Sequence, residues 1–132
     1  IFNVGDSRAY RINESGICAV TRDHSVVQDM LENGDITEEE ARRHPNRNLI
    51  TRALGTEREV LCDVFQLSLS KDDSLLLCSD GLWERLLEDE IMLDLHKAAT
   101  AEEWVYLLRC RAMMRKSTDV DNNTAIAIWI KE

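Results

Sequence analysis

The residues Ser74–Cys78 form a continuous apolar run, which limits the possible folds more than any other stretch of the chain. A strand exposed on one face alternates apolar and polar residues, whereas a run without alternation is typical of a strand buried on both faces. Turn residues precede the run at 71–73, and Asp80-Gly81 interrupts it afterwards. We therefore expect this run to be an interior strand of a sheet.

The other predicted elements are separated by clear turn and cap signals. Short β-favouring runs predict strands over 1–4, 8–12, 17–21, 60–69 and 124–130. Capping boxes and an apolar stripe predict helices between Ser25 and Gly34, from Thr37 to His44, and over 88–98 and 101–116. The predicted strands and helices are segregated along the chain rather than alternating as βαβ units, so we expect an α+β fold in which an antiparallel sheet is packed by helices.

The composition is that of an ordinary globular domain with an excess of acid. The chain has 132 residues, 44% of them apolar and 31% charged, and its formal net charge is −9. This length favours one domain. The negative field disfavours nucleic acid and anionic membranes as partners but suits a site that gathers divalent cations. Most of the acidic residues are expected on solvated helix faces.

The cysteines indicate a reducing compartment. Cys18, Cys62, Cys78 and Cys110 are widely spaced, form no C-x-x-C pair and fall in apolar surroundings. We expect reduced, buried thiols with a packing role, and hence a cytoplasmic protein. No signal peptide and no apolar run near 18 residues is present, so no membrane span is expected.

Three aspartates occupy similar places in the predicted structure. Asp6, Asp80 and Asp121 each lie at an end of a predicted strand. Carboxylates at strand ends can converge at one edge of a sheet, and Mg²⁺ and Mn²⁺ prefer such oxygen ligands. The alternative is structural, because Asp-Gly and Asp-Asn are also common turns and Asp6 fits an Asx-turn.

Six strings occur in a fixed order over nearly the whole chain. They are N-V-G-D-S-R-A-Y at 3–10, T-R-D-H-S at 21–25, a segment at 36–48, I-T-R-A-L-G at 50–55, L-L-L-C-S-D-G-L-W at 75–83 and D-N-N-T at 121–124. Together they resemble the signatures of the PPM, or type-2C, metal-dependent protein serine/threonine phosphatases of bacterial type. The resemblance covers the C-terminal part of that family's domain, so the chain at 1–132 is expected to form part of its α-β-β-α sandwich.

The resemblance implies a function and a metal site. Members of the family hydrolyse phosphoserine and phosphothreonine in proteins with metal-activated water, and a cognate serine/threonine kinase is an expected partner. By carry-over, Asp80 and Asp121 ligate one ion of a binuclear Mg²⁺ or Mn²⁺ centre. Asp6 contributes to a third ion that it shares with Asp80.

Other conspicuous residues are expected to serve structure or substrate recognition. His24 is interpreted as structural rather than as an acid–base catalyst, and Arg8 and Arg52 as internal packing or ion-pair residues. The segment at about 25–50 corresponds to the family's flap beside the active site. There, the side chains that could meet an acidic or phosphorylated partner are Arg42, Arg43 and Arg47.

Two departures from the family pattern leave two hypotheses open. The loop at 116–120 lacks the usual glycines and adds Asp119, and the family's N-terminal signatures, with the phosphate-binding arginine and the bridging aspartate, are absent. The chain is either part of an active phosphatase or a truncated, non-catalytic module that acts by protein binding. In either case we expect this piece alone to be inactive, and an exposed sheet to favour self-association.

Overall fold

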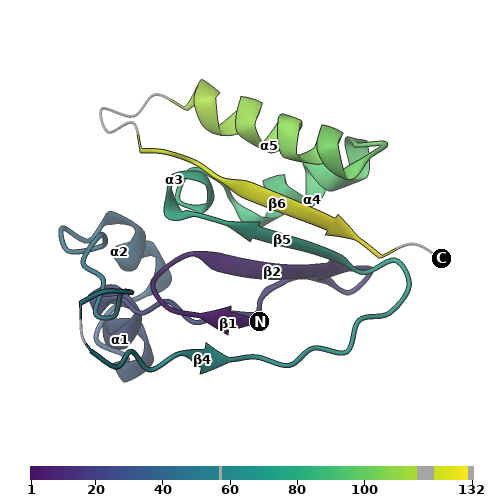
Figure 1. The fold of residues 1–132 in the computed structure, drawn as a ribbon. Coiled ribbons are helices and arrows are strands. Elements are labelled where there is room, and N and C mark those ends of the chain that lie inside the picture. Colours follow the sequence, from purple (N-terminus) through teal and green to yellow (C-terminus); the bar gives the residue numbers. More distant parts are fainter. Residues whose placement is uncertain (57, 116–120, 131–132) are drawn as a thin grey trace. The chain divides into compact units, whose positions relative to one another are not determined.

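The computed structural model describes residues 1–56, 58–115 and 121–130 (Figure 1). They fall into two compact units. The first unit comprises Ile1–Ser7 and Thr21–Gln66, and the second comprises Arg8–Val20 together with the chain from Leu67 onward. The loop at 116–120, with Asp119, lies outside the described residues. Both units combine antiparallel strands with helices, as the α+β prediction requires.

The second unit is built on a four-stranded antiparallel sheet. Its strand order is β3-β2-β5-β6, formed by β3 (Gly16–Ala19), β2 (Arg8–Asn13), β5 (Ser74–Cys78) and β6 (Ala125–Trp129). β5 pairs with β2 on one side and with β6 on the other, and its residue Leu76 is completely buried. The apolar run is therefore an interior strand, as predicted.

The described residues of the second unit include three helices, α3 (Asp80–Trp83), α4 (Glu88–Lys97) and α5 (Ala101–Met114). Of these, α4 and α5 line one side of the sheet (Figure 1). Trp104, Leu108 and Ala112 on α5 are all fully buried, which confirms the predicted apolar stripe. The Trp104 indole N–H donates to the carbonyl of Ile91 on α4 at 3.1 Å. None of the helices in the described residues is long and apolar enough to cross a membrane.

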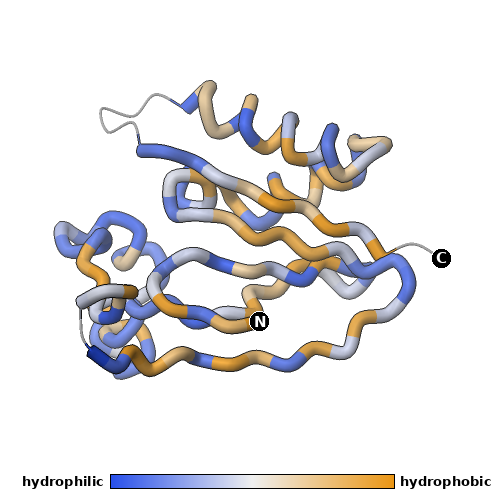
Figure 2. The backbone as a smooth tube through the Cα atoms, in the orientation of Figure 1, coloured by the Kyte–Doolittle hydropathy of each residue, from blue (hydrophilic) through white to orange (hydrophobic). Residues whose placement is uncertain are grey.

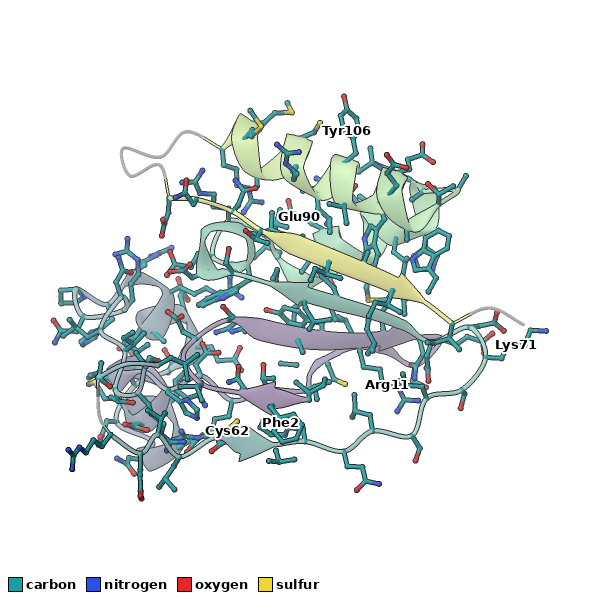
Figure 3. All side chains as sticks on the ribbon, viewed as in Figure 1. Phe2, Arg11, Cys62, Lys71, Glu90 and Tyr106 are labelled. Carbon is teal, nitrogen blue, oxygen red and sulfur yellow. The ribbon has the colours of Figure 1, made fainter. Side chains whose placement is uncertain are left out.

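Two ion pairs satisfy buried carboxylates at the border of this core. Arg11, labelled in Figure 3, donates to Asp73 at 3.2 and 2.8 Å. The hydrogen bond from the Ser70 backbone N–H makes the largest contribution to lowering the pKa of Asp73, and the hydrogen bond from Arg11 makes the second. On the helices, Arg111 binds Asp94 through two hydrogen bonds of 2.8 and 2.6 Å. Arg111 uses two nitrogens, which is the bidentate geometry that best compensates a buried carboxylate, whereas Arg11 reaches both oxygens of Asp73 through one nitrogen.

The part of the first unit that the structure describes forms a two-stranded sheet and two short helices. β1 (Phe2–Asn3) pairs with β4 (Asp63–Val64), and the helices are α1 (Val26–Asn33) and α2 (Glu38–Arg43). The predicted caps are confirmed. Ser25 Oγ accepts from the Gln28 N–H, Gly34 ends α1 at a φ of 77°, and Thr37 forms a reciprocal capping box with Glu40.

Three sequence expectations need correction. The strand predicted over 60–69 is only Asp63–Val64, because its partner β1 is equally short and a β-favouring run forms no longer ladder than its neighbour provides. The four thiols are free, but Cys18 and Cys62 are exposed rather than buried. The turn expected at Asp80-Gly81 is instead the start of the short helix α3.

Candidate metal centre

Asp80 stands where the interior strand β5 gives way to α3. It is the first residue of that helix, and Ser79 is the N-cap. A carboxylate in a first helical turn is favoured by the partial positive charge of the unpaired N–H groups there. One of its oxygens, Oδ1, accepts from the Gly81 N–H at 2.8 Å. The other oxygen, Oδ2, has no hydrogen-bond partner among the described residues.

Asp121 lies four residues before β6, and a backbone N–H orients its carboxylate in the same way as that of Asp80. Its Oδ1 accepts from the Asn122 N–H at 2.7 Å, and within the described ranges no partner reaches its Oδ2. Each carboxylate is therefore oriented by the backbone and keeps an oxygen available. An ionised carboxylate accepts several bonds, so an oriented one with a spare oxygen is a suitable ligand for a hard cation.

The sheet register brings these two aspartates to the same end of the second unit. The last pair of the β5–β6 ladder is Cys78↔Ala125, so the segments that carry Asp80 and Asp121 leave the sheet at the same end. The contact is close, because a Cβ placed on Gly81 would lie 2.4 Å from the Asn122 carbonyl oxygen and 3.4 Å from the Asp121 carbonyl carbon. The backbones that carry Asp80 and Asp121 therefore lie close together, and the convergence of their carboxylates on one ion stays a prediction.

The donor set fits Mg²⁺ or Mn²⁺ but is incomplete. Both aspartates offer hard oxygen ligands, which these ions prefer, and such ions often retain several waters. No group of three or more histidine, cysteine, aspartate or glutamate side chains that could hold a metal occurs in the described part of the chain. Two carboxylates can begin a metal site, and further ligands must come from water or from other residues.

Asp6 belongs to the first unit and follows a turn at Gly5. Gly5 has a φ of 107°, which is readily adopted only by glycine. His24 forms two hydrogen bonds with this glycine, one through its ring and one through its backbone. The Gly5 N–H donates to His24 Nδ1 at 3.0 Å, and the His24 N–H donates to the Gly5 carbonyl at 2.9 Å. The position of Asp6 is thus set through Gly5, and its sharing of an ion with Asp80 stays a prediction.

His24 is buried and its tautomer follows from its partners. Because Nδ1 accepts a backbone N–H, the ring proton must sit on Nε2, which lies 3.1 Å from Asp63 Oδ2. Arg52 donates to the other oxygen of Asp63 at 2.9 Å and to the carbonyl of Leu61 at 3.1 Å. The bonds from His24 and Arg52 lower the pKa of Asp63. This network supports the structural interpretation of both His24 and Arg52.

Arg8 also has a structural environment, in the second unit. Its guanidinium lies 3.4 Å from the centroid of the Trp83 ring and donates to the Tyr10 hydroxyl at 3.2 Å. A guanidinium over an indole face is a favourable cation–π contact. The packing role that the sequence indicated for Arg8 fits these contacts.

The candidate recognition arginines lie on and after α2 in the first unit. Arg42 and Arg43 are exposed, and Arg47 is half-buried. Arg43 pairs with Glu39 one helical turn away at 3.4 Å. An exposed pair of this kind is weak, so the guanidinium stays available to a ligand. A role in recognition remains a prediction for these residues.

The sequence alone assigns no role to Ser79, although its contacts reach Thr124 and Asn122 near the second aspartate. The sequence places it directly before Asp80-Gly81, where a turn rather than a helix was expected. Its actual partners lie 43 to 45 residues away in the chain.

Several known proteins are similar to the chain in sequence. The serine/threonine phosphatase stp of Listeria welshimeri is 44% identical over 91 residues, which are 69% of this chain and 36% of that protein. The serine/threonine protein phosphatase PstP of Mycobacterium tuberculosis is 37% identical over 102 residues, which are 77% of this chain and 20% of that protein. No model of a protein family matches the chain.

Solved structures agree with these relatives. Serine/threonine phosphatase Stp1 from Staphylococcus aureus is 39% identical with a TM-score of 0.86, over 99% of this chain and 51% of that one. The PPM phosphatase MsPP from Mycobacterium smegmatis is 36% identical with a TM-score of 0.85, over 98% and 54%. The chain belongs to the PPM family of serine/threonine phosphatases.

The match has a defined extent. The chain spans about four-tenths of the length of the first curated relatives and about half of the solved PPM structures, at their C-terminal part. A further PPM-type relative, the catalytic domain of PstP, is described in complex with two manganese ions, at 25% identity and a TM-score of 0.75. Metal dependence in the family agrees with the hard oxygen ligands that Asp80 and Asp121 offer.

Proposed function

We propose that the intact protein hydrolyses phosphoserine and phosphothreonine in proteins, using water activated by Mg²⁺ or Mn²⁺. The observation that carries this proposal is the pair of aspartates, Asp80 and Asp121, held at one end of the β5–β6 ladder with an oxygen of each available. Two or three bound ions would supply a water of lowered pKa and neutralise the charge of the phosphoryl group.

The residues of this chain have distinct parts in that proposal. Asp80 and Asp121 hold one ion, and each is kept in orientation by the N–H of the residue that follows it. Asp6 contributes to a further ion shared with Asp80. The segment at 25–50 acts as a flap, on which Arg42, Arg43 and Arg47 meet phosphorylated or acidic parts of the substrate. The exposure of Arg42 and Arg43 supports that role.

The test is Mn²⁺-dependent hydrolysis of a phosphothreonine peptide by the intact protein. Asp80→Asn keeps the size of the side chain and removes its charge, so turnover should fall to background. Asp89→Asn makes the same charge change at an exposed position in α4 and should leave turnover unchanged. Full Mn²⁺-dependent turnover by Asp80→Asn would contradict the proposed site.

This chain by itself should show negligible turnover. Its described residues contain no group of three candidate ligands, so a binuclear centre lacks a complete set of carboxylates here. The same assay on residues 1–132 checks the point, with the intact protein as the positive control. Turnover by the chain alone that is lost on Asp121→Asn would contradict this expectation.

A non-catalytic role is the second candidate, favoured by the same incomplete ligand set. A module that keeps the PPM scaffold would then act by binding a phosphorylated protein or its kinase.

Self-association is a further expectation. The strand β6 has no partner on its outer side among the described strands, and its Ile126 and Ile128 are exposed. The four free thiols are compatible with a reducing, cytoplasmic setting.

A further inference from the structure

Ser79 lies between a strand and a helix and uses its hydroxyl in an unusual direction. It is the N-cap of α3, where a serine side chain commonly accepts a bond from the N–H two or three residues later. The Ser79 side chain makes no such cap bond. Instead, Ser79 Oγ accepts from the Thr124 N–H at 3.1 Å and lies 3.4 Å from the Asn122 carbonyl oxygen, to which it donates.

The reason is that the backbone of Ser79 is already committed to α3. Its carbonyl accepts from the N–H groups of Leu82 and Trp83 at 3.1 and 3.2 Å. Its N–H still continues the ladder by donating to the Thr124 carbonyl at 3.1 Å. The carbonyl that would normally complete this antiparallel pair has turned into the helix, so the Thr124 N–H lacks a backbone acceptor. The hydroxyl takes the place of that carbonyl.

Gly81 allows the same two segments to meet. A Cβ at this position would be 2.4 Å from the Asn122 carbonyl oxygen, a distance that a backbone atom cannot tolerate. The reason for glycine here is space rather than a left-handed φ, because Gly81 is absent from the positive-φ residues of the described chain. The first turn of α3, which carries Asp80, therefore lies directly against the backbone of Asp121 and Asn122.

We propose that Ser79 is a positioning residue, whose hydroxyl holds the Asp121-Asn122 backbone in register with Asp80 so that both carboxylates reach one metal ion. This inference rests on the proposed metal site and adds to it a residue that touches neither ion nor substrate. Groups that orient metal ligands typically contribute roughly 10–100-fold to metal affinity. Ser79→Ala should therefore weaken Mn²⁺ binding by about that factor, without changing any ligand.

The experiment is a titration of the intact protein with Mn²⁺ alone, followed by the electron paramagnetic resonance signal of the free ion. Ser79→Thr keeps the hydroxyl, and its extra methyl suits the extended backbone of this residue, so it should bind Mn²⁺ like the wild type. Amide hydrogen exchange of Thr124 is the second measurement. Its N–H should exchange faster in Ser79→Ala and stay protected in Ser79→Thr.

Thr100→Ala is the matched control for a general loss of stability. It removes one hydroxyl from the same unit, where Thr100 Oγ accepts from the Glu103 N–H at the start of α5. It should lower the melting temperature and leave both the Mn²⁺ affinity and the Thr124 exchange rate unchanged. An equal loss of affinity in Thr100→Ala and Ser79→Ala would show that Ser79 acts through stability alone and would overturn the inference.

The outcomes separate this inference from the proposed function. If Asp80→Asn abolishes Mn²⁺ binding while Ser79→Ala binds like the wild type, the metal site stands and the positioning role is wrong. If Asp80→Asn binds Mn²⁺ like the wild type, the metal site itself is wrong and the inference falls with it. Weak binding by Ser79→Ala, normal binding by Ser79→Thr and faster Thr124 exchange only in Ser79→Ala support the role.

Discussion

Each of the two units is stabilised internally by a different kind of interaction. In the second unit the buried residues are mostly aliphatic or aromatic and form one cluster around Leu76, Leu82, Trp104 and Leu108. Among the described residues of the first unit the buried side chains are mostly polar, namely Asn3, Thr21, Asp23, His24 and Ser25, and Ala41 is the buried hydrophobic residue. Figure 2 shows the same contrast between the apolar strand β5 and the hydrophilic helix α2.

This difference affects how each unit should respond to a change. Apolar packing is non-directional, so the second unit gains stability roughly in proportion to the apolar area it buries. The first unit depends on directional bonds around His24, in which each partner satisfies another. Loss of His24 leaves the buried Gly5 N–H without its acceptor and removes one donor from the half-buried Asp63. We expect a robust second unit and a first unit that opens locally when a single polar residue is removed.

The largest expected effect is the loss of an apolar side chain from the second unit. Leu108→Ala removes a fully buried side chain, so the free energy of unfolding should fall by about 2–5 kcal/mol. Urea denaturation of the intact protein measures this change. Met114→Ala on the same helix is the control, because Met114 is 84% exposed and its loss should cost less than about 0.5 kcal/mol. Equal effects of the two substitutions would mean that this apolar cluster does not stabilise the unit.

A smaller and more local effect is expected from the polar network of the first unit. His24→Ala leaves the Gly5 N–H without its acceptor and Asp63 without one of its donors, at a cost of about 1–3 kcal/mol. Amide exchange should accelerate at Gly5 while the β5–β6 amides stay protected. His96→Ala, an exposed histidine of the second unit, should change neither. Uniform acceleration in both units after His24→Ala would remove the distinction between them.

The smallest effect concerns an exposed ion-pair cluster in the first unit. Arg22 donates to Glu32 at 2.6 and 2.8 Å and to Asp29 at 2.7 Å. The hydrogen bonds that Glu32 accepts, first from Arg22 and then from Gln28, lower the pKa of Glu32 from 4.5 to about 2. The folded pKa is the lower one, so the stabilisation is present above about pH 4.5 and is lost as the pH falls towards 2.

Thermal unfolding between pH 5 and 2 measures that contribution. Glu32→Gln should lower the melting temperature slightly at pH 5 and progressively less as the pH falls towards 2, because the wild-type carboxylate becomes protonated over that range. Glu38→Gln, which removes the same charge from an exposed position of α2, is the control. Surface pairs are weak and screened by salt, so high salt should reduce the difference. A Glu32→Gln effect that is independent of pH would refute this account.

Local sequence signals predicted α1, α2, α4 and α5 well, whereas the short helix α3 was predicted as a turn. Ser25, Gly34 and Thr37 cap helices at the positions predicted for them, because a cap bonds to backbone groups within a few residues. The interior strand at Ser74–Cys78 was equally clear from its unbroken apolar run. The strand over 60–69 was not predictable in length, because a ladder requires a partner and β1 provides only two residues. The exposure of Cys18 and Cys62 also depends on what packs over them.

The candidate metal centre divides in the same way. The sequence by itself determined that Asp80 and Asp121 end predicted elements and that oxygen ligands suit Mg²⁺ or Mn²⁺. Only the tertiary structure decided that Ser79 turns its hydroxyl towards Thr124 and that Gly81 lies against Asn122, since these contacts depend on the register of β5 and β6. Local rules act over a few residues, whereas the register of strands 45 or more positions apart is set by the packing of the whole unit.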